Sequence, residues 1–223
     1  MVRSAYSSGK PALGVGAGNV PAVIDESADI LLAVNSIIHS KTFDNGMICA
    51  SEQAVIVDEE IAGEFERIMK ANNCYFLQGE EIEKVSHFVI NPQTQAVNPD
   101  VVGKPACWIA EQSGIQVPDK TKILIAPLED VGPQYPLSRE KLSPVLAYFV
   151  VKGYGEGFAM AKKMLELGGL GHSAVIHSTN PDLIKAYGKE MKVGRVISNS
   201  PSSQGAIGDI YNTNTPSLTL GCG

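Results

Sequence analysis

The feature that most constrains the fold is the alternation of short apolar runs with helical patterns along most of the chain. Residues 123–126 and 145–151 are continuous runs rich in Val, Ile and Leu, as in strands buried on both faces. Residues 154–167 lie between two such strands and have a helical pattern. This alternation predicts an α/β fold, in which helices flank a mostly parallel sheet.

The same patterns predict the elements in order. Strands are expected at residues 11–16, 21–24, 54–57, 123–126, 145–151, 174–176 and 194–197. Helices are expected at residues 29–43, with Ser27 as the capping residue, and at 59–71, 80–88, 104–114, 154–167 and 181–191. Residues 1–7 have the pattern of the last turns of a helix, and the Gly-, Ser-, Asn- and Pro-rich stretch 199–217 is expected to be an irregular loop at an active site or interface.

Charge and composition exclude several classes of protein. The 223 residues carry a net charge of −6, and the basic residues form no stripe, which argues against nucleic-acid binding. Apolar runs are too short to cross a membrane, and no apolar signal core follows the first residues, so we expect a cytoplasmic protein with reduced thiols. The four cysteines and four histidines have no metal-ligand spacing, and we expect no metal site.

The segment FDNGMICASE, residues 43–52, is the first that could carry chemistry. Cys49 follows an Asn-Gly turn signal between a predicted helix and a predicted strand, where nucleophiles are often displayed. Backbone N–H groups in such a turn could stabilise a thiolate or an oxyanion. On local sequence alone, a small apolar residue packed under the turn is the more common outcome.

Glycines are concentrated in LGVGAGNVP, residues 13–21. Their spacing differs from that of a dinucleotide-binding loop, and a predicted strand follows rather than a helix. A tight crossing, where backbone approaches backbone or ligand, is the favoured interpretation. Gly16 and Gly18 are therefore the candidates to border a cofactor.

Two further segments precede or enter predicted strands. In SREKLSPVL, Glu140 could bind a pair of ribose hydroxyls, although an isolated glutamate is more often solvated. In GGLGHSAVI, His172 follows a Gly-rich turn and could be an acid, a base or a phosphate donor. A partly buried histidine bonded to backbone is an equally good interpretation of His172.

In order and spacing these four segments resemble the aldehyde dehydrogenase superfamily over essentially the whole chain, and its CoA-acylating branch in particular. MVRSAYSSGKP and KTFDNGMICASEQ look like the acetaldehyde dehydrogenase half of the bifunctional aldehyde–alcohol dehydrogenases. The resemblance implies the family's catalytic domain at about residues 19–205. Residues 1–18 would then end an NAD-binding domain whose remainder lies upstream of Met1, and residues 206–223 would be a returning or interface segment.

The resemblance also implies roles for single residues. Cys49 takes the place of the catalytic thiol, and His172 that of a histidine which CoA-acylating members carry near it. Glu140 matches the glutamate of the family's Glu-x-Phe-Gly-Pro-Val motif, which holds the nicotinamide ribose. Leu142 stands in for the motif's aromatic residue and Ser143 for its glycine.

One departure bears on the reaction. Hydrolytic members have Glu-Leu-Gly-Gly-Lys-x-Pro upstream of the thiol, and in an ungapped alignment on Pro21 their general-base glutamate falls on Val15. Without a carboxylate to activate water, a thioester on Cys49 should wait for a stronger nucleophile such as the CoA thiol.

The expected activity is therefore the reversible conversion of acetaldehyde, or a similar short aldehyde, with CoA and NAD to acyl-CoA and NADH. The expected partners are a short-chain aldehyde, CoA and further copies of the chain in a homo-oligomer, with filaments possible in the bifunctional relatives. The alternative is a non-catalytic fragment that only folds and self-associates. A thiol redox protein is disfavoured because no resolving cysteine lies near Cys49 in the sequence.

Overall fold

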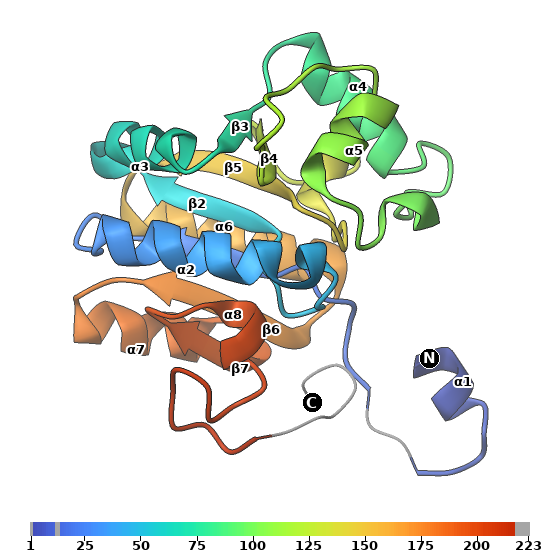
Figure 1. The fold of residues 1–223 in the computed structure, drawn as a ribbon. Coiled ribbons are helices and arrows are strands. Elements are labelled where there is room, and N and C mark those ends of the chain that lie inside the picture. The colour runs from blue at the N-terminus through green and yellow to red at the C-terminus, as the bar shows by residue number, and fades with distance from the viewer. Residues whose placement is uncertain (1, 12–13, 217–223) are drawn as a thin grey trace.

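A seven-stranded parallel sheet forms the centre of the computed structural model, which describes residues 2–11 and 14–216 (Figure 1). The strand order is β3-β4-β5-β2-β1-β6-β7, and every neighbouring pair is parallel. The strands are β1 Pro21–Ile24, β2 Ala54–Asp58, β3 Cys74–Phe76, β4 Ile123–Pro127, β5 Val145–Val151, β6 Gly171–His177 and β7 Val193–Ser198. The predicted α/β fold with a mostly parallel, helix-flanked sheet is confirmed.

Helices cover both faces of this sheet (Figure 1). On one face lie α2 Ile30–Thr42, α3 Glu59–Ala71 and the short α8 Ser202–Gly205. On the other lie α6 Gly153–Gly168 and α7 Pro181–Glu190. The remaining helices are α1 Val2–Tyr6, α4 Glu80–Val89 and α5 Ala106–Gln112, with 3-10 turns η1 Phe43–Gly46, η2 Pro99–Val101 and η3 Pro136–Ser138.

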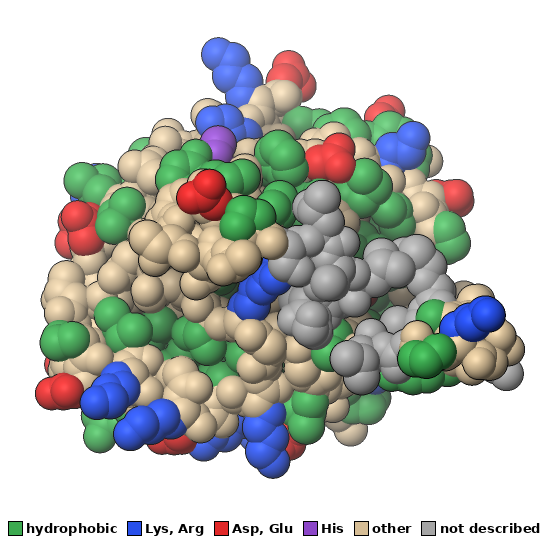
Figure 2. Space-filling model, turned by 90° about the horizontal axis from the view of Figure 1, so that it is seen from below, with side chains coloured by type: hydrophobic (Ala, Val, Ile, Leu, Met, Phe, Trp, Pro, Cys, Tyr) green, Lys and Arg blue, Asp and Glu red, His purple; other side chains and the backbone are tan. Residues whose placement is uncertain are grey.

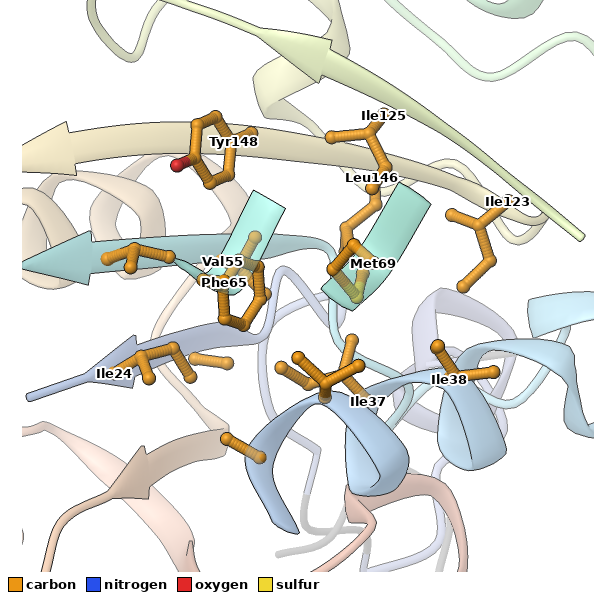
Figure 3. Close-up of a cluster of buried hydrophobic side chains, with 14 of the residues drawn as sticks. Ile24, Ile37, Ile38, Val55, Phe65, Met69, Ile123, Ile125, Leu146 and Tyr148 are labelled. Carbon is orange, nitrogen blue, oxygen red and sulfur yellow. The ribbon is translucent and has the colours of Figure 1, made fainter. Parts of the chain in front are cut away.

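Strand β2 explains why the apolar runs are continuous. Val55 and Val57 pack against α2 and α3, whereas Ala54 and Ile56 belong to the cluster beneath α6. Because successive side chains of a strand point to opposite faces, a strand covered on both sides must be apolar at every position. Figure 3 shows the first of these two clusters, between α2, α3 and the sheet.

The strand expected at residues 11–16 is not formed at its described residues, and one observed strand was not predicted. Of the strand expected at residues 11–16, residues 12 and 13 lie outside the described residues, and the others are not in a strand. The Gly16 N–H donates to the Leu170 carbonyl at 2.9 Å. The short strand β3 was not predicted, because three residues after Asn73 contain too little pattern to recognise.

Two helices begin at other residues than expected because of the residues at their N-caps. α2 begins at Ile30, and its capping residue is Asp29, whose carboxylate accepts from the Leu32 N–H at 3.0 Å. Ser27, the expected cap, instead binds the Asp25 carboxylate. α5 starts only after Pro105, which stands at its N-cap, so the helix is shorter than the predicted 104–114.

Acidic and basic side chains lie near one another around the edge of the face in Figure 2. No helix within residues 2–11 and 14–216 is long and apolar enough to cross a membrane. The same residues contain no group of three or more His, Cys, Asp or Glu side chains that could hold a metal ion.

Candidate functional site

The candidate residues lie at the amino-terminal edge of the sheet. Gly18 precedes β1, Cys49 precedes β2, Glu140 precedes β5, and His172 is the second residue of β6. These four strands are adjacent and parallel, so the segments that enter them meet at one edge. The topology thus brings together residues separated by more than a hundred positions in the sequence.

Gly18 marks the closest approach within this group. A Cβ atom on Gly18 would lie 2.3 Å from the Cys49 carbonyl oxygen and 3.1 Å from Oε1 of Glu140. Any side chain there would overlap the Cys49 backbone and crowd the carboxylate. The backbone of Gly18 therefore lies against both residues, and Glu140 lies beside the Cys49 segment.

The loop that holds Cys49 has an unusual backbone. Asp44, Asn45 and Gly46 have φ values of 49°, 48° and 71°, three consecutive residues in the left-handed region. The Asn45 side chain fixes this turn by donating to the Gly103 carbonyl at 3.0 Å. Such conformations cost free energy and persist where the surroundings hold them, often at functional sites. The turn ends with Cys49 exposed at the surface.

Glu140 and His172 differ in their surroundings. Glu140 is half-buried, and this burial raises the pKa of its carboxyl group, while nearby His172, Lys41 and Lys141 oppose the rise. His172 is buried at the start of β6 and interacts electrostatically with Glu140. The structure therefore brings the carboxylate and the imidazole close enough to interact, and their roles stay predictions.

Gly16 is part of the glycine crossing and has a different neighbour from Gly18. A Cβ on Gly16 would lie 2.3 Å from the Gly169 carbonyl carbon, so the two backbones are in direct contact. Beside them, Cγ1 of Val15 lies 2.9 Å from the position of a Cβ on Gly171, next to His172. The contacts of Gly16 favour the backbone crossing over contact with a ligand, and its cofactor role stays a prediction.

Leu142 lies between Glu140 and β5. Its φ of 47° is rare for a residue with a branched side chain, and its carbonyl accepts from the Gly103 N–H at 3.1 Å. Gly103 also receives the Asn45 hydrogen bond, so one residue supports both the Cys49 turn and the Glu140 segment. Leu142 is half-buried, and its contact with a cofactor stays a prediction.

Sequence reasoning missed three buried charged residues at this edge, namely Lys41, Glu52 and Lys141. Lys141 donates to the backbone carbonyls of Gln53, Leu137 and Arg139 at 3.0, 2.7 and 2.6 Å. It thereby ties the segment before β2 to the segment before β5. The only signal for these residues was their position next to the Cys49 and Glu140 motifs, since lysine and glutamate are usually solvated.

We predict that iodoacetamide labels Cys49 in preference to Cys74 and Cys107. Burial raises the pKa of Cys74 to about 12, which lowers its thiolate fraction about 10³-fold. The Cys107 thiol is half-buried and donates to the Asp119 and Thr121 carbonyl oxygens, with Sγ 3.4 Å from each, so the reagent has less access to it. Peptide mapping after brief labelling of the folded protein measures the order of reaction.

The control for this experiment removes Cys222, which lies outside the described residues, by Cys222→Ser in every sample. Labelling in denaturant should then reach Cys49, Cys74 and Cys107 equally. Faster reaction of Cys74 or Cys107 than of Cys49 in the folded protein would contradict the prediction.

Comparison with known proteins finds the same fold and similar sequences. The model of the aldehyde dehydrogenase family matches residues 2–209. The aldehyde-alcohol dehydrogenase of Streptococcus pneumoniae serotype 4 is 51% identical over 230 aligned residues, which cover 100% of this chain and 26% of that protein. The chain thus spans about a quarter of the length of such curated relatives.

Solved structures agree. An acetylating aldehyde dehydrogenase from Geobacillus thermoglucosidasius has a TM-score of 0.93 and 48% identity, and the match covers 100% of this chain and 48% of that one. A propionaldehyde dehydrogenase from Rhodopseudomonas palustris, solved with bound CoA and an acylated cysteine, has a TM-score of 0.84 and 27% identity. That match covers 97% of this chain and 48% of the other.

Proposed function

Because this chain belongs to the aldehyde dehydrogenase family, we propose that it carries the catalytic thiol of a CoA-acylating aldehyde dehydrogenase. The reaction is the reversible conversion of a short aldehyde, CoA and NAD to acyl-CoA and NADH. The observation that carries the proposal is the exposed Cys49 on a left-handed turn, with the Glu140 carboxylate beside it across Gly18. The names of similar proteins, which include acetylating and propionaldehyde dehydrogenases, support this class of substrate.

The chemistry begins at Cys49. Its thiolate attacks the aldehyde carbon, and the backbone N–H of Cys49 donates to the oxyanion that forms. The tetrahedral carbon then loses hydride, and its carbonyl re-forms as a thioester on the sulfur. A CoA thiolate attacks this thioester, the acyl group moves to CoA, and the Cys49 thiolate leaves. Every step reverses, so acyl-CoA can equally acylate Cys49.

The residues at the sheet edge fit an NAD molecule. NAD, when bound, supplies the acceptor for the hydride. Gly18 lets the Cys49 backbone and the Glu140 carboxylate lie close together, because any side chain there would overlap the Cys49 carbonyl oxygen. The half-buried Glu140 carboxylate can accept hydrogen bonds from ribose hydroxyls. In this proposal Glu140, Leu142 and Gly18 border the nicotinamide end of the cofactor, and His172 lies next to the reacting thiol.

The assignment of parts of the chain belongs to the same proposal. Residues 19–205 form the catalytic domain, and residues 1–18 belong to the cofactor side. In the segment after residue 205, Tyr211 contacts His39 of α2, with 3.3 Å between the hydroxyl oxygen and Nε2. The described part of this segment therefore packs on the catalytic domain, while residues 217–223 lie outside the described residues. We expect a homo-oligomer that works in the cytoplasm.

We predict that the protein accepts an acetyl group from acetyl-CoA without NAD. The Cys49 thiolate attacks the thioester carbonyl, and CoA leaves as its thiolate, so no redox cofactor is needed. Intact-mass measurement should detect one acetyl group per chain, and peptide mapping should locate it on Cys49.

The matched control is Cys49→Ala, which should remain unmodified under the same conditions. Adding CoA to the acetylated protein should remove the acetyl group and restore acetyl-CoA. If the folded protein accepts no acetyl group, or if Cys49→Ala is modified equally, the proposed function is wrong. The alternative, a non-catalytic fragment that only folds and self-associates, is then favoured.

A further inference from the structure

Lys41 is a buried lysine with no use in the steps described above. It is completely buried in the last turn of α2, and its Nζ has no hydrogen-bond partner among the described residues. Its neighbour in the fold, Lys141, is equally buried but donates to three carbonyls. A buried ammonium is costly to desolvate, so one without a hydrogen-bond partner calls for an explanation other than stability.

The position of Lys41 connects it to the reacting thiol. The chain runs from Lys41 directly through η1 to Cys49, and the Lys41 carbonyl oxygen lies 3.2 Å from the position of a Cβ on Gly46 in that turn. The Lys41 charge interacts with Glu140, which lies on the segment before β5. Oε1 of Glu140 in turn lies beside the Cys49 backbone, next to Gly18. Lys41 is therefore buried at the start of the loop that ends with the exposed Cys49.

The charged groups around Lys41 come from two further segments. Glu52 is completely buried three residues after Cys49, and its carboxylate accepts from the Ser202 N–H at 3.0 Å. Glu140 and Lys141 face Lys41 from the segment before β5, and His172 on β6 acts on Glu140. Glu52 and Glu140 favour the ammonium form of Lys41, whereas the charge of Lys41 disfavours protonation of Lys141.

We infer that Lys41 is a positioning residue whose buried ammonium, which interacts electrostatically with Glu52 and Glu140, favours the thiolate form of Cys49. The inference rests on the proposed function in one respect, that the Cys49 thiolate is the nucleophile. A positive charge near a thiol lowers the thiol pKa, and burial of the ammonium reduces the screening of its charge by water. No covalent change at Lys41 is involved.

The Lys41 ammonium also loses its proton near neutral pH. Burial lowers the pKa of Lys41 to about 7, against the opposing charges of Glu52 and Glu140. Burial raises the pKa of Glu52 to about 7. As the pH rises through 7, this pair loses positive charge and gains negative charge. The thiolate of Cys49 is therefore favoured less as the pH rises, and its titration should be broader than that of a single group.

The test is the pH profile of iodoacetamide reaction at Cys49, read by peptide mapping. Lys41→Met removes the charge and keeps an unbranched apolar chain in the buried site. We expect the reaction at pH 7 to slow by roughly three- to tenfold, as a thiol pKa higher by about half to one unit would produce. The profile should also become as steep as a single ionisation.

The matched control is Lys104→Met, an exposed lysine next to Gly103, which supports the same loop. Its charge is screened by solvent, so the profile should stay as in the unmodified protein. If Lys41→Met does not fold, Glu52→Gln is the second variant, and loss of that carboxylate should move the inflection near pH 7 to lower pH. An unchanged profile in a folded Lys41→Met or Glu52→Gln protein overturns the inference.

The outcome is distinguishable from failure of the proposed function. Acetyl transfer from acetyl-CoA to Cys49, together with an unchanged pH profile, overturns only the role of Lys41. A changed profile without acetyl transfer overturns only the proposed reaction.

Discussion

Replacing Phe65 with alanine should lower the free energy of unfolding by about 3–5 kcal/mol, the usual cost of removing a buried phenylalanine. Phe65 projects from α3 and is completely buried against the sheet (Figure 3). Its ring is stacked on Tyr148 of β5, with 6.2 Å between centroids. Its removal would leave a cavity between α3 and the sheet that the surrounding side chains only partly fill.

Urea unfolding followed by circular dichroism measures this loss as a lower midpoint with an unchanged slope. Leu31→Ala is the matched control, because Leu31 is a large apolar residue on α2 that is 60% exposed. Its effect should stay within about 0.5 kcal/mol. A loss below about 1 kcal/mol for Phe65→Ala would show that the contact between α3 and the sheet is less important than its burial indicates.

The fold was largely predictable because the covered strands have a distinctive pattern. β2 and β5 are apolar at successive positions, and only a strand with helices on both faces requires this. The predicted strand at 11–16 failed for the opposite reason. Gly16 allows a close crossing with the Gly169 backbone, which needs no neighbouring strand. In the sequence, Gly14 and Gly16 alternate with apolar residues as the residues of a strand would.

The residues of the candidate site that lie in sequence motifs were predictable, whereas the buried residues that surround them were not. Cys49, Glu140 and His172 stand beside turn signals at strand entrances, and parallel strands bring such entrances to one edge. The burial of Lys41 and Glu52 depends on how α2 and α8 close over the loop, which no local pattern encodes. The contact of Gly18 with Cys49 likewise needs a tertiary structure to be seen.

Replacing Val15 with glutamate should shorten the lifetime of an acetyl group on Cys49 in water. We expect Val15→Glu to speed hydrolysis of the thioester by up to about 10²–10⁴-fold, the usual contribution of a general base. In our proposal the acyl group waits for CoA because no carboxylate stands at residue 15 to activate water. The lifetime can be measured by acetylating the protein with acetyl-CoA, removing CoA and following intact mass.

The substitution has a structural cost that the design must separate from catalysis. The Val15 side chain is half-buried, and its Cγ1 lies 2.9 Å from the position of a Cβ on Gly171. A longer polar side chain must therefore turn away from Gly171 or displace it, which could loosen the turn before His172. Val15→Gln adds nearly the same bulk and polarity without the base, so it reports this structural effect alone.

The three lifetimes decide between two explanations for the choice of CoA over water. Faster hydrolysis in Val15→Glu than in Val15→Gln, with a lifetime in Val15→Gln close to that of the unmodified protein, supports the missing carboxylate as the cause. The difference should also grow as the pH rises through the pKa of the new carboxyl group, since only the ionised form can accept a proton from water. Equal lifetimes in three proteins that still accept acetyl groups would mean that the turn around Cys49 excludes or misorients water, whatever residue stands at position 15.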